Sequence, residues 1–158
     1  MLSVHKIDLK KLGISLAISL GTGIVSGLLT MTAMESFEQA VKPPLTPPGF
    51  IFPIVWTILF TLMGISSYIV YKSDDENTKK ALAIYGIQLA VNFFWPIFFF
   101  NLQAYLFSFI WIILLWLLII LMIYEFSKVS KLAAWLQVPY LIWVTFAAYL
   151  NLGIFLLN

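Results

Sequence analysis

The amino-acid sequence predicts an all-α integral membrane protein, built as a bundle of five transmembrane helices. The chain is 62% hydrophobic and only 10% charged, and its mean hydropathy is +1.00. A soluble domain is about a quarter charged and roughly half apolar, so this composition belongs to the membrane class. Five stretches are also long enough to cross a bilayer, which takes about 20 mostly apolar residues.

The predicted spans are separated by short polar connections with one exception. The spans cover residues 12–34, 50–71, 81–101, 105–126 and 132–157. The long connection, residues 35–49, holds four of the seven prolines. No second domain or internal repeat is evident, so residues 1–158 are predicted to form a single transmembrane domain.

The lysine distribution predicts which side of the membrane each connection faces. All nine basic residues are lysines, and only Lys42 lies on the side of the long loop. The other eight lie on the side of the N-terminus, at Lys6, Lys10, Lys11, Lys72, Lys79, Lys80, Lys128 and Lys131. Because basic residues collect on the cytoplasmic side, we expect a cytoplasmic N-terminus, with the C-terminus and the Pro-rich loop outside the cell membrane.

The composition excludes several kinds of site. The chain has no cysteine, which rules out disulfides, thiolate catalysis and iron–sulfur ligation. The single histidine, His5, lies in the basic N-terminal tail, where it is a poor metal ligand. A formal net charge of +2 is too small to indicate nucleic acid. We therefore expect no metal, no cofactor and no nucleic-acid partner, and no conventional catalytic group.

Small side chains recur on one face of the first span. Ser15, Ser19, Gly23 and Gly27 follow one another at intervals of four residues. That spacing aligns them on a helix and allows close backbone approach. The face can serve packing within the chain or a homodimer, and the sequence leaves both open.

The spans carry uncharged polar and aromatic stripes rather than charges. No Asp, Glu, Lys, Arg or His lies in the middle of a span, which removes the usual basis for proton- or ion-coupled transport. Three stripes at helical spacing are formed by Gln88, Asn92, Trp95 and Phe99, by Tyr140, Trp143, Ala147 and Asn151, and by Trp56, Phe60 and Met63. They fit ordinary helix packing or a pocket for a flat, hydrophobic ligand.

Prolines suggest how a pocket could arise. Pro53, Pro96 and Pro139 fall within spans two, three and five, where each is expected to bend its helix and help leave a cavity. The stretch KPPLTPPG, residues 42–49, is conformationally stiff. It can act as a lid beside such a cavity or as a plain connector.

Three motifs together resemble the TspO/MBR family, the translocator proteins and tryptophan-rich sensory proteins. KPPLTPPG with FIFPIVWTILFTLMG resembles that family's K-P-x-W-x-P-P loop and second helix. QLAVNFFWPIFFF is similar to its Q-L-x-x-N-x-x-W third helix, and VPYLIWVTFAAYLN to its P-Y-x-x-W-x-x-F-A-x-x-L-N fifth helix. The motifs occur in the family's order over nearly the whole chain.

The resemblance implies a commonly dimeric five-helix bundle in the lipid membrane that binds porphyrins such as protoporphyrin IX and haem, and benzodiazepine-type drugs. These are ligands rather than cofactors. The implied binding residues are Trp56, Phe60, Asn92, Trp95, Trp143, Phe146 and Ala147. The implied lid residues are Lys42, Pro43, Pro47 and Pro48. In some bacterial members, light-driven breakdown of protoporphyrin is attributed to the tryptophans that match Trp56 and Trp143.

The chain departs from the family pattern in its loop. The usual Trp-Tyr pair reads Ser36-Phe37, and the loop tryptophan is Leu45. The expected function is porphyrin binding for sensing, buffering or light-dependent breakdown. A transporter of tetrapyrroles or other lipophilic molecules is the alternative, and a purely structural partner role is also open.

Overall fold

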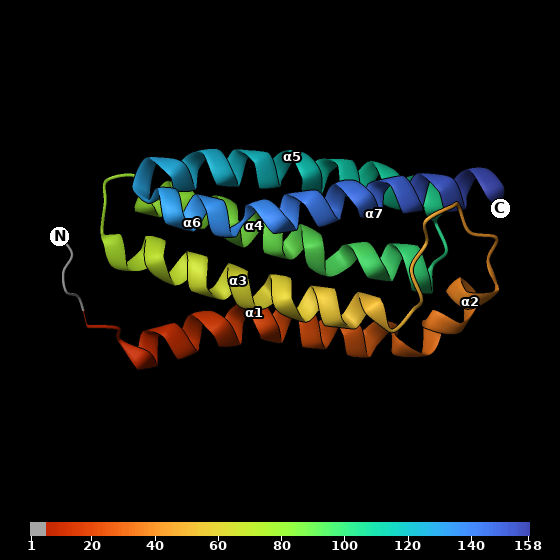
Figure 1. Cartoon of the computed structure of the whole chain (residues 1–158), viewed down its shortest axis with the longest axis horizontal. Helices are drawn as coiled ribbons and strands as arrows, with labels where there is room; N and C mark the ends of the chain where they lie inside the picture. Colours follow the sequence, from red (N-terminus) through yellow and green to blue (C-terminus); the bar gives the residue numbers. More distant parts are fainter. Residues whose placement is uncertain (1–5) are drawn as a thin grey trace.

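The computed structural model describes residues 6–158, and all regular elements in that part of the chain are helical (Figure 1). His5 lies outside the described residues. The elements in chain order are α1 (Leu9–Thr30), η1 (Met31–Ala33), α2 (Met34–Gln39), α3 (Ile51–Ser73), α4 (Thr78–Pro96), η2 (Ile97–Asn101), α5 (Tyr105–Val129), α6 (Lys131–Leu136) and α7 (Val138–Leu157).

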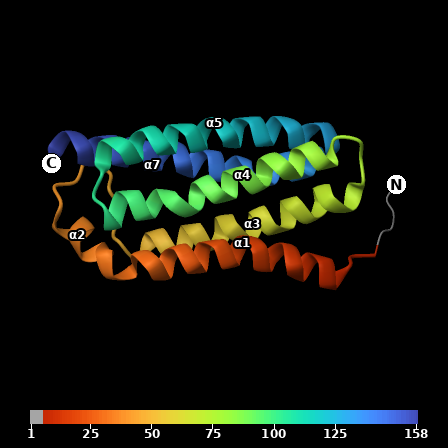
Figure 2. The same cartoon turned by 180° about the vertical axis from the view of Figure 1, so that it is seen from behind.

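These elements form five spans, which confirms the predicted fold class. Each is long and apolar enough to cross a membrane, and they cover Leu9–Gln39, Ile51–Ser73, Thr78–Asn101, Tyr105–Val129 and Lys131–Leu157. The helices lie side by side along one axis, and the described chain starts and ends at opposite ends of the bundle (Figure 1). Seen from behind, α4 lies between α5 and α1 (Figure 2).

The first span is longer than predicted, and the loop is correspondingly shorter. The helix continues through η1 and α2, so the predicted loop start at residue 35 is wrong and the loop runs from residue 40 to residue 50. In α2, Phe37 is only 5% exposed, whereas Glu35 and Glu38 face outward. The two acids lower the hydropathy, which is why the sequence suggested that the span ends here. The helix continues because α2 is amphipathic and buries the ring of Phe37 on the end of the bundle.

The expectation that three prolines bend their helices is wrong for Pro53, which is the third residue of α3. The first turn of a helix has no partner for its N–H groups, so proline starts this helix without a kink. Pro139 lies in the first turn of α7, two residues after span five is interrupted at Gln137, and a proline's missing N–H group accounts for such a break. Pro96 ends α4 and is followed by the π-helical turn η2.

Helix α1 packs closely against α3 through small residues. Ser19 Oγ donates a hydrogen bond to the carbonyl of Phe60 at 2.7 Å, and the ring of Phe60 lies over Gly23. Gly64 sits against α1: a Cβ there would lie 2.8 Å from Ser19 Oγ and 2.9 Å from the Cα of Leu16. This part of the small-residue face therefore serves packing within the chain.

The remaining residues of that face do not pack in this way. A Cβ at Gly27 would meet no atom within 4 Å, and Gly27 is exposed. Ser15 is partly exposed and lines a groove between α1 and α4.

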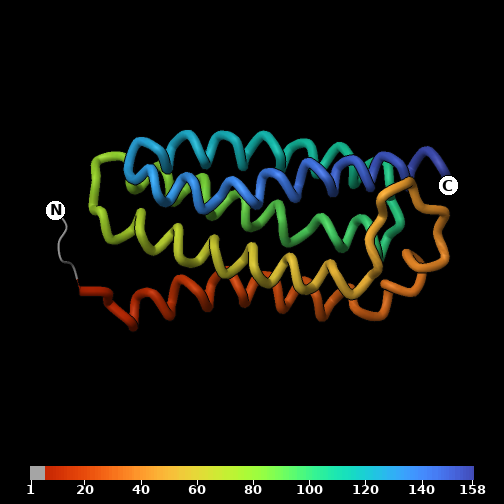
Figure 3. The backbone as a smooth tube through the Cα atoms, viewed as in Figure 1, coloured from red at the N-terminus to blue at the C-terminus, as the bar shows by residue number. Residues whose placement is uncertain are grey.

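The Pro-rich loop is fastened to the end of α7 (Figure 3). Pro43 is buried against Gly153, where a Cβ would lie 2.6 Å from the proline ring. The hydroxyl of Tyr149 donates to the carbonyl of Pro44 at 2.7 Å, and Asn158 exchanges two hydrogen bonds with the backbone of Val41. The loop is thus held by shape and by hydrogen bonds.

Replacing Gly64 by alanine should separate α1 from α3. The new methyl group meets backbone rather than a flexible side chain, so we expect a loss of about 1–3 kcal/mol. Thermal unfolding in detergent measures it. Gly27→Ala is the matched control and should be neutral or stabilising by about 0.5–1 kcal/mol, since alanine favours helix. Equal melting temperatures for the two variants would contradict this packing.

Gly153→Ala should loosen the loop without unfolding the bundle. The added methyl group displaces Pro43 from its notch on α7. Hydrogen exchange at the backbone amides of residues 40–46 should therefore accelerate, while exchange in α3 and α5 stays unchanged. Gly27→Ala again serves as control, and unchanged loop exchange in Gly153→Ala would show that the notch does not hold the loop.

Candidate ligand-binding site

Four aromatic side chains separate α3 from α7 at the loop end of the bundle. Phe52 meets Trp143 with ring centroids 5.9 Å apart, and Trp56 meets Tyr140 at 6.3 Å, both in edge-on geometry. We call Phe52, Trp56, Tyr140 and Trp143 the aromatic wedge. The contacts join the two helices through side chains alone, because the large rings keep the backbones apart.

At the other end of the bundle, α3 approaches its neighbour closely. Ser66 Oγ donates to the carbonyl of Ala133 in α6 at 2.7 Å, and both residues are fully buried. Small side chains at one end and aromatic rings at the other make α3 diverge from the α6–α7 span toward the loop. The diverging region is therefore filled by rings that a flat ligand could replace.

The aromatic wedge continues into further rings. Along α7, Trp143 contacts Phe146 at 5.5 Å, and along α3, Trp56 contacts Phe60 at 5.6 Å. Phe37 of α2 packs on Phe52 at 5.6 Å and covers the loop end of the wedge. Aromatic contacts of this kind contribute about 0.5–1.5 kcal/mol each beyond the area that they bury.

A buried chain of hydrogen bonds lies beside the wedge. Asn92 Nδ2 donates to the hydroxyl of Tyr140 at 2.7 Å, and that hydroxyl donates to Gln88 Oε1 at 2.6 Å. The three residues are between 0% and 5% exposed. Tyr140 thus belongs to the wedge by its ring and to the polar chain by its hydroxyl, which fixes the ring's position.

A second polar pair lies nearer the loop end. Trp95 Nε1 donates to Asn151 Oδ1 at 3.0 Å, and Asn151 Nδ2 donates to the carbonyl of Tyr105 at 2.8 Å. The indole of Trp95 is stacked on Phe99 with centroids 5.1 Å apart. Its N–H group is therefore already satisfied within the protein.

Trp143 differs from Trp111 and Trp116, although all three side chains are partly buried. Its indole N–H is buried and has no hydrogen-bond partner among the described residues. By contrast, Trp111 donates to the carbonyl of Val91 and Trp116 to the hydroxyl of Thr145. A buried donor without an acceptor costs about 1–3 kcal/mol. An acceptor on a ligand would remove that cost.

The structure brings most of the predicted binding residues together. Trp56, Phe60, Trp143 and Phe146 make ring contacts around the wedge, and Asn92 joins them through Tyr140. The remaining two predicted residues lie in the core near it: Trp95 is 8% exposed and Ala147 is 5% exposed.

The predicted lid residues lie in the loop over this end of the bundle. Lys42 Nζ donates to the carbonyls of Glu38 and Ala40 and lies 5.2 Å from the ring centre of Phe37. Pro43 is buried, and Pro47 and Pro48 lead into α3. Leu45, at the family's tryptophan position, is 81% exposed and has a left-handed φ of 72°.

The motifs missed three residues of this region. Phe52 lies one helical turn before Trp56, so extending that stripe backward would have found it. The motifs mark Phe37 only as a difference from the family's Trp-Tyr pair and do not indicate that its ring is buried in the core. Gln137 is fully buried with both amide atoms unpaired among the described residues. Nothing in its local sequence indicated this.

Among the described residues, the one buried charged side chain lies at the end of the bundle far from the loop. Glu125 is 2% exposed and pairs with Lys80 at 3.5 Å and Lys128 at 3.3 Å. Among residues 6–158, no group of three acidic or histidine side chains could hold a metal ion. The site around the wedge therefore offers aromatic surface and uncharged hydrogen-bonding groups.

Comparison with known proteins identifies the family. A "Tryptophan-rich protein TspO" of Chlorobaculum tepidum is 38% identical and aligns over 92% of this chain and 96% of its own. A "Tryptophan-rich sensory protein" of Cereibacter sphaeroides is 34% identical over 78% and 77%, and the human "Translocator protein" 33% identical over 89% and 85%. The model of the TspO/MBR family matches residues 15–157. The chain is therefore a membrane protein that belongs to the TspO/MBR family.

Proposed function

We propose that the protein binds porphyrins in the aromatic wedge and serves porphyrin sensing, buffering or light-dependent breakdown. The observation that carries this proposal is the buried indole N–H of Trp143 in the wedge, which has no hydrogen-bond partner within residues 6–158. A tetrapyrrole has a flat apolar face for stacking and polar groups at its edge that can accept a hydrogen bond.

Binding would replace ring contacts rather than fill a ready-made void. A porphyrin enters by parting Phe52 from Trp143 and Trp56 from Tyr140, whose contacts are edge-on. Stacking on the macrocycle compensates the contacts that are lost. The Asn92–Tyr140–Gln88 chain keeps α4 and α7 in place while the rings move.

The same arrangement supports sensing and photochemistry. One relative carries the printed name "Tryptophan-rich sensory protein". Trp56 and Trp143 would flank the bound macrocycle, so light absorbed by the porphyrin, with dissolved dioxygen as the oxidant, would lead to oxidation of its ring or of these indoles. Loss of porphyrin absorbance under illumination, and not in darkness, distinguishes breakdown from binding alone.

Transport is the second candidate, favoured by the printed name "Translocator protein" of the human relative. Against coupled transport, the buried carboxylate of Glu125 is already paired with two lysines at one end of the bundle. Passive passage would need the loop to leave α7. Porphyrin flux into sealed vesicles, with and without a proton gradient, separates these possibilities.

We also propose that the protein lies in the cell membrane with its N-terminus in the cytoplasm. The N-terminal end, the α3–α4 turn and the α5–α6 turn, which carry eight of the nine lysines, lie at the same end of the bundle (Figure 1). The Pro-rich loop and the end of α7 lie at the other. By the positive-inside rule, the loop then faces outward.

A dark titration of the detergent-purified protein with protoporphyrin IX tests the proposed site. Wild type should show saturable quenching of tryptophan fluorescence. Trp56→Phe with Trp143→Phe should weaken affinity by at least about tenfold, because the hydrogen bond and indole stacking surface are lost. Trp111→Phe with Trp135→Phe is the matched control, since it also leaves four of the six tryptophans.

Two results would contradict the proposal. Equal affinity of both double variants would place the porphyrin elsewhere. Absence of saturable quenching in wild type would mean that the altered loop, with Leu45 at the family's tryptophan position, accompanies a different ligand.

A further inference from the structure

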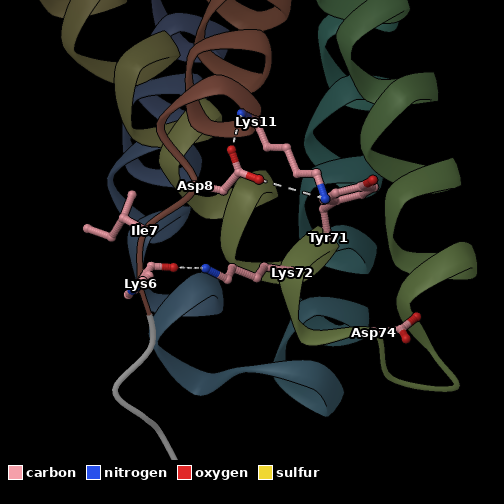
Figure 4. Close-up of a pocket in the computed structure, with 7 residues that line it drawn as sticks. All are labelled: Lys6, Ile7, Asp8, Lys11, Tyr71, Lys72 and Asp74. Atoms are coloured by element: carbon pink, nitrogen blue, oxygen red, sulfur yellow. Dashed lines mark hydrogen bonds and ion pairs between the residues drawn. The ribbon is translucent and has the colours of Figure 1, made fainter.

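Two adjoining cavities lie at the lysine-rich end of the bundle, away from the aromatic wedge. The first, of about 640 Å³, opens among the N-terminal segment and the end of α3, and we call it the basic chamber (Figure 4). The second is a groove of about 420 Å³ between α1, α3 and α4. Lys11 and Tyr71 line both, so the two cavities are neighbours.

The basic chamber carries more positive than negative charge. Lys6, Lys11 and Lys72 line it together with Asp8 and Asp74. The ammonium group of Lys11 lies 3.8 Å from the carboxylate of Asp8 and 5.6 Å from the ring centre of Tyr71 (Figure 4). Both partners of this ion pair are about half exposed, so the pair is weak and Lys11 can turn to another anion.

The groove has apolar walls and a polar floor. Ile14 and Ile18 of α1 face Leu82 and Leu89 of α4 across it. Tyr85 of α4 also lines the groove and is 6% exposed. Its hydroxyl has no hydrogen-bond partner among the described residues, so the groove contains an unused buried donor.

Two serine hydroxyls, those of Ser19 and Ser67, lie near the Tyr85 hydroxyl. Both are engaged in other hydrogen bonds. Ser19 Oγ donates to the carbonyl of Phe60 at 2.7 Å, and Ser67 Oγ donates to the carbonyl of Gly64 at 3.1 Å. Neither serine oxygen is a hydrogen-bond partner of the Tyr85 hydroxyl among the described residues, so an acceptor for Tyr85 is something that a ligand in the groove could supply.

We propose that the chamber and the groove together bind one anionic phospholipid of the surrounding membrane. Its phosphate lies in the basic chamber beside Lys11 and Lys72. An ester carbonyl accepts the hydrogen bond of Tyr85, and one acyl chain runs along the groove between α1 and α4. The site is separate from the proposed porphyrin site and does not depend on it.

The depths of the three parts match such a lipid. Ser67 lies one helical turn from Tyr71 along α3, and Ser15 lies one turn from Lys11 along α1, about 5.4 Å deeper in each case. Tyr85 is level with Ser67. A hydrogen-bond donor one turn below a basic group fits a phospholipid, whose ester groups lie just below its phosphate.

Native mass spectrometry of the full chain in neutral detergent tests this proposal with palmitoyl-oleoyl phosphatidylglycerol. Wild type should bind one molecule more tightly than phosphatidylcholine with the same chains. Lys11→Gln should lower the affinity about fivefold, the contribution of one lysine to an anionic lipid surface. Tyr85→Phe should weaken both lipids, because it removes the donor to the ester group.

Gly86→Leu tests the groove itself. Gly86 lines it, and a Cβ there would meet no atom within 4 Å, so a leucine at this position starts in open space and extends into the acyl path. This variant should lose binding of both lipids. Gly27→Leu is the matched control, since it adds the same side chain in open space on α1. Lys131→Gln is the control for charge, because Lys131 is exposed outside both cavities.

Four outcomes would overturn the proposal. The first is unchanged lipid binding in Gly86→Leu. The second is an equal loss in Lys131→Gln and Lys11→Gln, which would indicate charge alone. The third is binding of free glycerol phosphate as tight as that of the lipid, which would leave the groove unused. The fourth is a dimer that forms in place of the lipid complex and is lost in Gly86→Leu, which would assign the groove to a second copy.

Discussion

Helix α3 packs on its neighbours in two opposite ways, through small residues and through aromatic rings, and the interior of the bundle follows from that contrast. Toward α1 and α6 it presents Gly64 and Ser66, so the backbones nearly touch. Toward α7 it presents Phe52 and Trp56, whose rings hold the helices apart. In a membrane no water drives helices together, so association relies on close packing and on hydrogen bonds. The small-residue contacts therefore anchor α3, and the aromatic end is free to accept a ligand.

The polar groups reinforce this division. The hydroxyl of Tyr140 links Asn92 and Gln88 of α4 to α7 by two buried hydrogen bonds, while Gln88 Nε2 has no partner among the described residues. Trp143 is left with an unused donor beside them. The Pro-rich loop closes the same end, held by the Gly153 notch and the hydroxyl of Tyr149. The hydrogen-bonded residues of α4 and α7, the unpaired donor of Trp143 and the Pro-rich loop held on α7 thus belong to one region of the molecule.

Much of the fold could be predicted because hydropathy and helical spacing report on single helices. The five spans, the small-residue contact of Ser19 and Gly23, and the stripes on α3 and α7 follow from such patterns. The end of the first span could not be predicted, since α2 continues as a polar helix around the buried Phe37. Pro53 was expected to bend its helix because a proline's effect depends on its distance from the helix start, which hydropathy does not locate.

The site was harder to predict than the fold for a physical reason. Spacing tells which face a residue is on but not which residue lies opposite. Tyr140 was visible as a member of a stripe, whereas its two hydrogen bonds to α4 depend on how α4 and α7 are placed. Trp143, Gln137 and Tyr85 each have a buried polar atom with no hydrogen-bond partner among the described residues. The lack of a partner is likewise a result of packing, and a local sequence pattern cannot predict it.

The most direct test of the central claim follows the indole N–H signals of the six tryptophans by nitrogen-edited NMR as protoporphyrin IX is added in the dark. The account predicts a large shift of the Trp143 signal as it gains an acceptor. The signals of Trp111 and Trp116 should stay in place, because their N–H groups are already bonded within the protein. A Trp143 signal that does not move at saturating porphyrin would contradict the proposed site.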